Sequence, residues 1–248
     1  MAKRRHLPDD WVQIVRQRVA YWNLLTAPER ERLGELAEHL VSTKRWEAAK
    51  DFVLTDEIVV TIAAQAGVLV LALDTSYFGK VTTIIVHPSS FAIPGPRTSA
   101  IRGMIADGSP PLHGEAHHDR GPVLLSWDQA RFSARHRGRG HNVVLHEFAH
   151  KMDMLDGVVD GTPILPDRGT LDRWVEVCAA ELDSMRNGDS DSFLDEYAAT
   201  DPGEFFAVAT EAFFDIPIDL RAAKPELYDV LVSFYRQDTA AREEVVSR

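Results

Sequence analysis

Two histidines separated by three residues form the pattern in this chain that points most directly to chemistry. Residues 146–150 read His-Glu-Phe-Ala-His, an H-E-x-x-H sequence. On a helix, His146 and His150 lie one turn apart on the same face, so both imidazoles can bind one metal ion. Glu147 lies beside the pair, where its carboxylate can reach a water molecule at that metal. The motif therefore predicts a catalytic zinc site on a helix.

The residues around the motif predict an amphipathic helix over about 141–155. Its apolar side chains fall on the face opposite the histidines: Val144, Leu145, Phe148, Met152 and Leu155. Alternatively, His146 and His150 are polar groups on a solvent-exposed helix face without a functional role. The spacing of the histidines, the amphipathic helix and the adjacent glutamate together favour metal binding. A purely structural zinc site is disfavoured, because such sites usually have four ligands and favour cysteine. Cys178 is the one cysteine of the chain.

A catalytic zinc ion needs a third protein ligand, and two aspartates after the motif come into question. Asp156 stands where metzincin-like sequences place their last ligand, but Asp153 occupies the position of the glycine that those sequences require. The metzincin pattern is therefore rejected. Asp153 lies on the face of the two histidines, one turn beyond His150, and we expect it to accept a hydrogen bond that fixes the tautomer of a ligand imidazole.

Two glutamates on a downstream helix, at about 203–214, are the other candidates. Glu204 and Glu211 share one face of an otherwise apolar helix, where a buried carboxylate needs a partner such as a metal ion. Glu204 can instead belong to a capping box with Asp201. Glu211 can instead form a hydrogen bond or a salt bridge between packed helices. The residues alone leave both glutamates open as the third ligand.

Three stretches of the chain resemble the Mlc titration factor A family of bacterial zinc metallopeptidases. They are His146–Asp153, Asp160–Pro163 and Tyr197–Val208, and the helical N-terminal region and the predicted strands fit the same family. The shorter Glu-Phe-Phe-Ala element that begins at Glu204 is also similar to the catalytic domain of anthrax lethal factor. The resemblance implies a gluzincin-type fold, in which a glutamate from a second helix completes the metal site.

The same resemblance implies roles for particular residues. One Zn²⁺ ion per chain is expected on His146, His150 and Glu204, with Glu147 as the general base. Tyr197 is expected in the active site, where its hydroxyl can donate a hydrogen bond to the oxyanion of the substrate. Glu211 then becomes a residue that orients a ligand imidazole. The resemblance further implies an aminopeptidase-like activity and, in some members, binding to a glucose-responsive transcriptional repressor.

Three functions from different classes are consistent with these residues. The first is a zinc peptidase that hydrolyses peptide substrates. The second is a regulatory binding protein that sequesters a transcription factor, with peptidase activity secondary. The third is a helical scaffold whose H-E-x-x-H sequence is accidental. Because a pure binder could keep the histidines and lose the base, the presence of Glu147 favours the first function over the second. Zinc content distinguishes the third from both.

The elements that position these residues predict an α+β fold in a single domain, residues 1–248. Residues 1–75 are expected to be helical, and the apolar run Ile58–Leu73 indicates a buried helix that can continue into a strand. Residues 76–140 predict a small central sheet and loops, with β-branched strands at Val81–Val86 and Val123–Trp127. Residues 141–248 predict the zinc-binding helical part, with helices at about 141–155, 170–187, 203–214 and 224–236.

Composition and charge exclude several classes of protein. The 248 residues include 27 Lys and Arg against 38 Asp and Glu, a net charge of −11 that argues against direct nucleic-acid binding. The acidic excess lies in residues 141–248, which hold 9 basic and 23 acidic residues against 18 and 15 in residues 1–140. A single cysteine is typical of a reducing compartment. With Asp9 and Asp10 where a signal peptide would be apolar, and no membrane span, we expect a cytoplasmic protein.

Overall fold

The computed structural model describes residues 8–49, 52–89, 121–188 and 193–246. Its helices are α1 (Asp9–Arg18), α2 (Ala27–Thr43), α3 (Asp56–Leu69), α4 (Trp127–Arg135), α5 (Val143–Asp153), α6 (Arg168–Asn187), α7 (Pro202–Asp215), α8 (Pro217–Ala223), α9 (Pro225–Tyr235) and α10 (Thr239–Val246). Its strands are β1 (Arg45–Ala48), β2 (Thr83–His87) and β3 (Val123–Ser126). Short 3-10 helices include η3 (Met154–Asp156) and η4 (Glu196–Ala199). The predicted α+β class is confirmed, with helices dominant.

The three strands form one parallel sheet in the order β1-β2-β3. Trp46 pairs with Ile84, and Val86 pairs with Leu125. Helix α3 makes the crossover that parallel neighbours such as β1 and β2 require. β1 lies within the first 75 residues, which the sequence analysis expected to be helical throughout, and this expectation is wrong for Arg45–Ala48. The strand is short and contains no β-branched residue, so it carries little of the signal that identifies strands.

Helix α3 is the buried helix predicted from the apolar run. It is covered by α1, α2, α4 and α5, and nearly all of its side chains are inaccessible to solvent. Gly67 allows the close approach of α2, because a Cβ atom there would lie 3.0 Å from Leu33 Cδ1. The run does not continue into a strand, since the residues after Leu69 form turns. A strand after this helix, which the sequence left possible, is therefore not formed.

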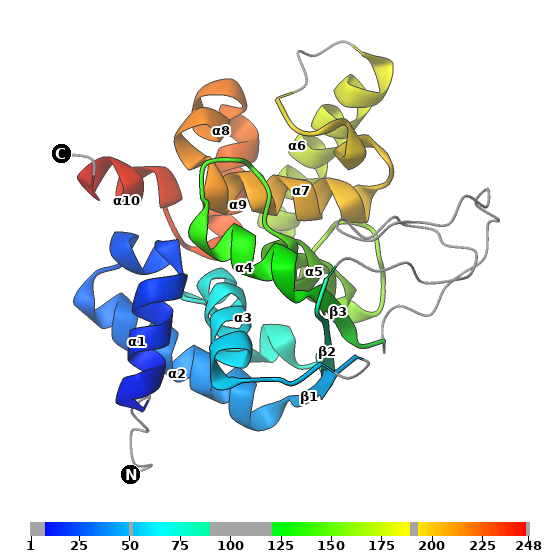
Figure 1. Ribbon diagram of the computed structural model, residues 1–248. Coiled ribbons are helices and arrows are strands. Elements are labelled where there is room, and N and C mark those ends of the chain that lie inside the picture. Colours follow the sequence, from blue (N-terminus) through cyan, green and yellow to red (C-terminus); the bar gives the residue numbers. More distant parts are fainter. Residues whose placement is uncertain (1–7, 50–51, 90–120, 189–192, 247–248) are drawn as a thin grey trace.

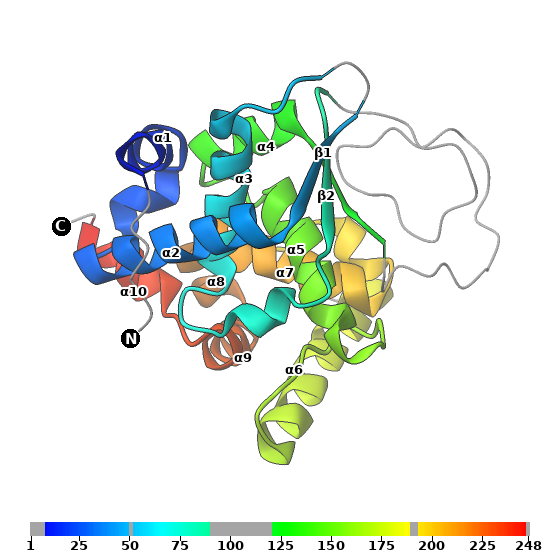
Figure 2. The same ribbon diagram turned by 90° about the horizontal axis from the view of Figure 1, so that it is seen from below.

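Helix α5 lies between the N-terminal helices and the C-terminal helices, with α3 on one side and α7 on the other (Figure 1). β3 also packs against α5, so the helix with the H-E-x-x-H motif contacts both the sheet and the bundle. Seen from below, α6 projects away from the remaining helices (Figure 2). Aromatic side chains of α6, α7 and α9 pack on one another, and they include Trp174, Phe206, Phe213, Phe234 and Tyr235.

The helices predicted for residues 141–248 correspond to α5, α6, α7 and α9, with boundaries shifted by a few residues. Helices α8 and α10 were not expected from the sequence. Both predicted strands form, but the second ends at Ser126 because Trp127 begins α4. Most of the loop region expected between the two predicted strands, residues 90–120, lies outside the described residues. Within the described ranges, the helices are too short or too polar to cross a membrane.

Candidate metal centre

Helix α5 brings both histidines of the motif to one face. Asn142 is its N-cap, and its side-chain oxygen accepts hydrogen bonds from the N–H groups of Val144 and Leu145 at 3.0 and 3.2 Å. The ring centroids of His146 and His150 lie 4.8 Å apart. His146 is fully buried, whereas 15% of the His150 side chain remains exposed. Solvent therefore reaches the pair from the His150 side.

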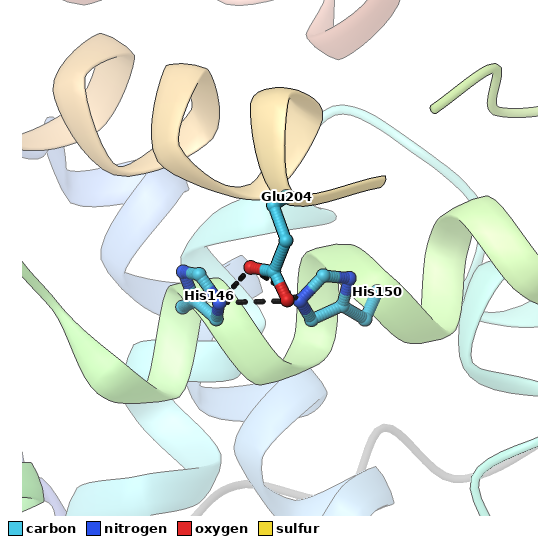
Figure 3. A group of neighbouring side chains, drawn as sticks. All are labelled: His146, His150 and Glu204. Atoms are coloured by element: carbon cyan, nitrogen blue, oxygen red, sulfur yellow. Dashed lines mark hydrogen bonds and ion pairs between the residues drawn. The ribbon is translucent and has the colours of Figure 1, made fainter. Parts of the chain in front are cut away.

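Glu204 reaches these histidines from the first turn of α7. Asp201 is the N-cap of this helix, and the backbone N–H of Glu204 donates to its carboxylate at 2.9 Å, with Pro202 in the first turn. In a full capping box the Glu204 carboxylate would turn back to the N-cap backbone. Instead it points down between His146 and His150 (Figure 3). Asp201 thus provides the cap, and the Glu204 side chain faces α5.

The ligand atoms of the three residues form a compact triangle. Nε2 of His146 lies 3.1 Å from Nε2 of His150 and 3.1 Å from Oε2 of Glu204, and Nε2 of His150 lies 3.4 Å from the same oxygen. Ligands at ~2.0–2.1 Å in tetrahedral geometry around zinc would be separated by ~3.3 Å. The spacing and the two-nitrogen, one-oxygen donor set therefore fit one transition-metal ion.

The charges around the triangle favour a cation. Burial alone would raise the pKa of Glu204, but hydrogen bonding to His146 and His150 lowers it to about 2. Burial alone would lower the pKa of His146, but the carboxylates of Glu211 and Glu204 raise it to about 10. Both shifts have the same origin, which is that buried carboxylates surround the imidazoles and favour positive charge between them.

Glu211, the second glutamate of α7, lies on the other side of His146. Its Oε1 is 3.4 Å from Nδ1 of His146 and accepts a hydrogen bond from the backbone N–H of Asn142 at 3.3 Å. Its Oε2 is 3.7 Å from Nδ1 of His141. Glu211 is fully buried. Its carboxylate lies on the Nδ1 side of the His146 ring, away from the Nε2 atom that faces His150 and Glu204. A carboxylate at this distance from the second ring nitrogen can orient an imidazole, and this role of Glu211 stays a prediction.

Asp153 does not make the contact that the sequence suggested. The residue is fully buried, but Nδ1 of His150 has no hydrogen-bond partner in the part of the chain that the structure describes. Burial raises the pKa of Asp153 to about 6, while the backbone N–H groups of Gly161 and Thr162 favour its ionised form. Neither carboxylate oxygen of Asp153 has a hydrogen-bond partner among the described residues. Asp156, rejected above as third ligand, is exposed.

Glu147 and Tyr197 flank the triangle. Glu147 is 8% exposed, its Oε1 has no hydrogen-bond partner among the described residues, and burial raises its pKa. Tyr197, in η4, has its ring centroid 6.3 Å from that of His146. Burial raises the pKa of the Tyr197 hydroxyl, and the neighbouring Glu204 carboxylate raises it further. Its phenol is therefore protonated at neutral pH and able to donate a hydrogen bond.

Two buried polar residues that support the site were missed from the sequence. Asn142 Nδ2 donates to Gln65 Oε1 at 3.1 Å, and Gln65 Nε2 donates to the carbonyl of Ala130 at 3.1 Å. These bonds tie the start of α5 to α3 and α4. In the sequence, an asparagine directly before a predicted helix indicates an N-cap, and a glutamine within an apolar run indicates a buried polar group that needs a hydrogen-bond partner. The sequence does not tell which residues they would meet.

A helix with an H-E-x-x-H motif that faces a glutamate from a second helix is the architecture of a metallopeptidase. The family model described as glucose-regulated metallo-peptidase M90 matches residues 1–236. The chain therefore belongs to this metallopeptidase family, as the resemblance in the sequence predicted. Membership establishes the metallopeptidase class, and the buried His-His-Glu group is a place where the metal can bind.

Curated relatives agree over most of the chain. An uncharacterized protein of Synechocystis sp. is 34% identical over 94% of this chain and 85% of its own length. The Mlc titration factor A of Pectobacterium atrosepticum is 30% identical over 88% of this chain and 83% of its own length. The protein of the same name from Salmonella typhi is 31% identical over the same shares. The similarity thus extends across the helices that hold both halves of the site.

Proposed function

We propose that this chain is a zinc-dependent peptidase of the gluzincin type, with His146, His150 and Glu204 as the protein ligands of one zinc ion. The observation that carries the proposal is the triangle of ligand atoms with sides of 3.1, 3.1 and 3.4 Å, formed by two helices far apart in sequence. Three protein ligands leave a further coordination position open, which is typical of catalytic zinc. A structural zinc site would usually be closed by a fourth ligand.

The residues around the triangle suit peptide hydrolysis. Bound zinc polarises a carbonyl group and lowers the pKa of a water molecule. Glu147 acts as the general base that takes a proton from the attacking water and delivers it to the leaving amine. Tyr197 donates a hydrogen bond to the oxyanion of the substrate. Glu211, whose Oε1 lies 3.4 Å from Nδ1 of His146, favours the tautomer that is protonated at Nδ1, which leaves the Nε2 lone pair directed into the triangle.

The aminopeptidase-like subtype and the cytoplasmic location are further parts of this proposal. The subtype is supported by the resemblance of the motifs around His146 and Tyr197 to the metallopeptidase family. The location is supported by the single cysteine, which suits a reducing compartment. Peptides with a free or an acetylated amino terminus test the subtype, because an aminopeptidase cleaves only the free form.

A peptide-library cleavage assay tests the peptidase function. We expect zinc-loaded protein to hydrolyse library peptides, chelated protein to lose this activity, and re-added zinc to restore it. Cleavage that persists after complete removal of the metal would contradict the proposal. A fully loaded protein that hydrolyses no peptide of the library would contradict it as well.

The names of the relatives favour a second function, the binding of a transcriptional repressor. This chain is 30–31% identical to proteins named Mlc titration factor A. That similarity supports the proposal that it also sequesters a repressor of the Mlc type. The two functions are separable by Glu147→Gln, which removes the base and leaves the surface unchanged. If sequestration is independent of catalysis, the variant binds a purified Mlc-type repressor as wild type does in calorimetry.

A further inference from the structure

The segment that leads into α5 is hydrogen-bonded to two carboxylates of α7. Oδ2 of Asp215 accepts hydrogen bonds from the backbone N–H groups of Arg139 and Gly140 at 2.8 and 2.7 Å. One turn earlier on α7, Oε1 of Glu211 accepts a hydrogen bond from the backbone N–H of Asn142 at 3.3 Å. Helix α7 therefore holds the backbone of this segment on both sides of residue 141.

His141 lies between these hydrogen bonds and faces the second oxygen of Glu211. Nδ1 of His141 is 3.7 Å from Oε2 of Glu211, whereas Oε1 of the same carboxylate is 3.4 Å from Nδ1 of His146. The Glu211 side chain is fully buried, but 47% of the His141 side chain is exposed. The buried carboxylate thus lies between two imidazoles, one in the candidate metal centre and one at the protein surface.

The two oxygens of Glu211 have different partners. A buried carboxylate needs polar partners to offset its loss of hydration. Oε1 meets the N–H of Asn142 and the ring of His146, and Oε2 meets the ring of His141. A separation of 3.7 Å is longer than a direct hydrogen bond but within the range of an ion pair, so this contact is electrostatic. It favours the orientation of the carboxylate in which Oε1 faces His146.

A second histidine of the same segment provides a comparison. His136 is exposed, and its ring stacks on that of Phe132 with centroids 4.4 Å apart. Its Nδ1 atom lies 2.9 Å from the carbonyl oxygen of the same residue. These contacts join His136 to the helix that it follows, α4. The contact of His141 instead crosses to a buried carboxylate on α7.

We infer that His141 is a positioning residue for the metal centre, because it holds the Glu211 carboxylate in the orientation that directs the His146 ring toward the metal. The inference rests on the proposed function, in which His146 is a zinc ligand. It extends the site by one residue, from the buried triangle to the protein surface. The competing interpretation is that His141 packs against α7 and contributes to folding alone.

Zinc affinity of paired variants tests this inference. His141→Leu removes the polar ring, and His141→Lys keeps a charged donor within reach of Oε2. We expect His141→Leu to lower the affinity by about 3–5-fold in competition with a chelator, the effect of a partly exposed ion pair, and His141→Lys to retain the wild-type value. In a Glu211→Ala background His141→Leu should have no further effect, because the contact is already lost. His136→Leu is the matched control and should bind zinc as wild type does.

Amide hydrogen exchange in the metal-free protein tests the inference independently of zinc. The N–H of Asn142 reports the position of Glu211, to which it donates. The N–H groups of Arg139 and Gly140 donate to the other carboxylate and report the rest of the segment. We expect His141→Leu to speed exchange at Asn142 and to leave the other two amides unchanged, and His141→Lys to restore the protection.

Several results would overturn the inference. They are a folded His141→Leu variant with unchanged zinc affinity and unchanged exchange at Asn142, equal losses in His141→Leu and His141→Lys, and effects of His141→Leu and Glu211→Ala that add. Faster exchange at all three amides would show a merely structural role. A wild-type protein that binds no zinc would contradict the proposed function instead, and the exchange data would still decide whether His141 holds Glu211.

Discussion

Helices α3 and α7 are both buried along almost their whole length, yet they bury polar groups in different ways. In α3, Gln65 is fully buried and both ends of its side-chain amide are hydrogen-bonded to neutral partners. In α7, Glu204, Glu211 and Asp215 are carboxylates that are at least 99% buried. A buried amide with complete hydrogen bonds costs little, whereas a buried charge needs a counter-charge. Helix α7 therefore buries more carboxylates than neutral hydrogen bonds alone would stabilise, and it is the helix that contributes Glu204 to the candidate metal centre.

The three carboxylates of α7 differ in their partners. Oδ2 of Asp215 accepts hydrogen bonds from the N–H groups of Arg139 and Gly140 at 2.8 and 2.7 Å, so backbone dipoles stabilise this oxygen. Glu211 contacts Nδ1 of His146, and Glu204 contacts the Nε2 atoms of both motif histidines. The partners therefore change along one helix, from backbone N–H groups before α5, to the Nδ1 side of His146, to the Nε2 atoms of both histidines, where we propose that the metal binds.

Glu204→Ala should have the largest effect, because it removes one of three ligands. We expect the variant to lose zinc binding in equilibrium dialysis while it remains folded, since Asp201 still caps α7. A variant that keeps zinc and loses only ~1 kcal/mol of stability would show that Glu204 is a capping residue.

Glu147→Gln should preserve the metal and abolish most of the activity. The amide keeps the shape of the side chain but cannot accept the proton, and general-base catalysis contributes ~10²–10⁴-fold. The measurement is kcat on a cleaved peptide, with zinc content as the control. Activity within a few-fold of wild type would exclude Glu147 as the base.

Glu211→Ala should weaken zinc binding without abolishing it. The loss of an outer contact to a ligand imidazole typically lowers metal affinity by ~10–100-fold. Competition with a chelator of known affinity measures the change. A complete loss, equal to that of Glu204→Ala, would mean that Glu211 is itself a ligand.

Gln65→Leu should have the smallest effect on the metal and a visible effect on stability. It leaves the Asn142 amide and the Ala130 carbonyl without their partner, which costs about 1–3 kcal/mol. Denaturant unfolding measures that cost, and zinc stoichiometry should stay at the wild-type value. Loss of zinc from a folded variant would contradict the contrast drawn between α3 and α7.

The sequence predicted the helices that carry the site because their apolar periodicity is long and regular. It also predicted that His146 and His150 share a face, since this follows from their spacing alone. The choice between Glu204 and Glu211 was beyond such reasoning, because both occupy one face of α7. The family resemblance favoured Glu204, and the packing of α7 across α5 gives the physical difference between them. It sets Glu204 against the Nε2 atoms and Glu211 against Nδ1.

Other features depended on contacts distant in sequence. Strand β1 forms because Arg45–Ala48 pairs with β2, which lies beyond the α3 crossover. The expected hydrogen bond between Asp153 and a ligand imidazole is absent among the described residues, where neither His150 Nδ1 nor either carboxylate oxygen of Asp153 has a hydrogen-bond partner. Helical spacing gives the face on which Asp153 lies but not the atoms that its side chain meets.

X-ray absorption spectroscopy of the zinc-loaded protein tests the central claim most directly. We expect one zinc per chain, bound by two imidazole nitrogens and a carboxylate oxygen at ~2.0–2.1 Å, with no sulfur ligand. In Glu204→Ala this signal should disappear. A protein that cannot be loaded with zinc, or a spectrum with a sulfur from Cys178 at ~2.3 Å, would contradict the assignment of the site.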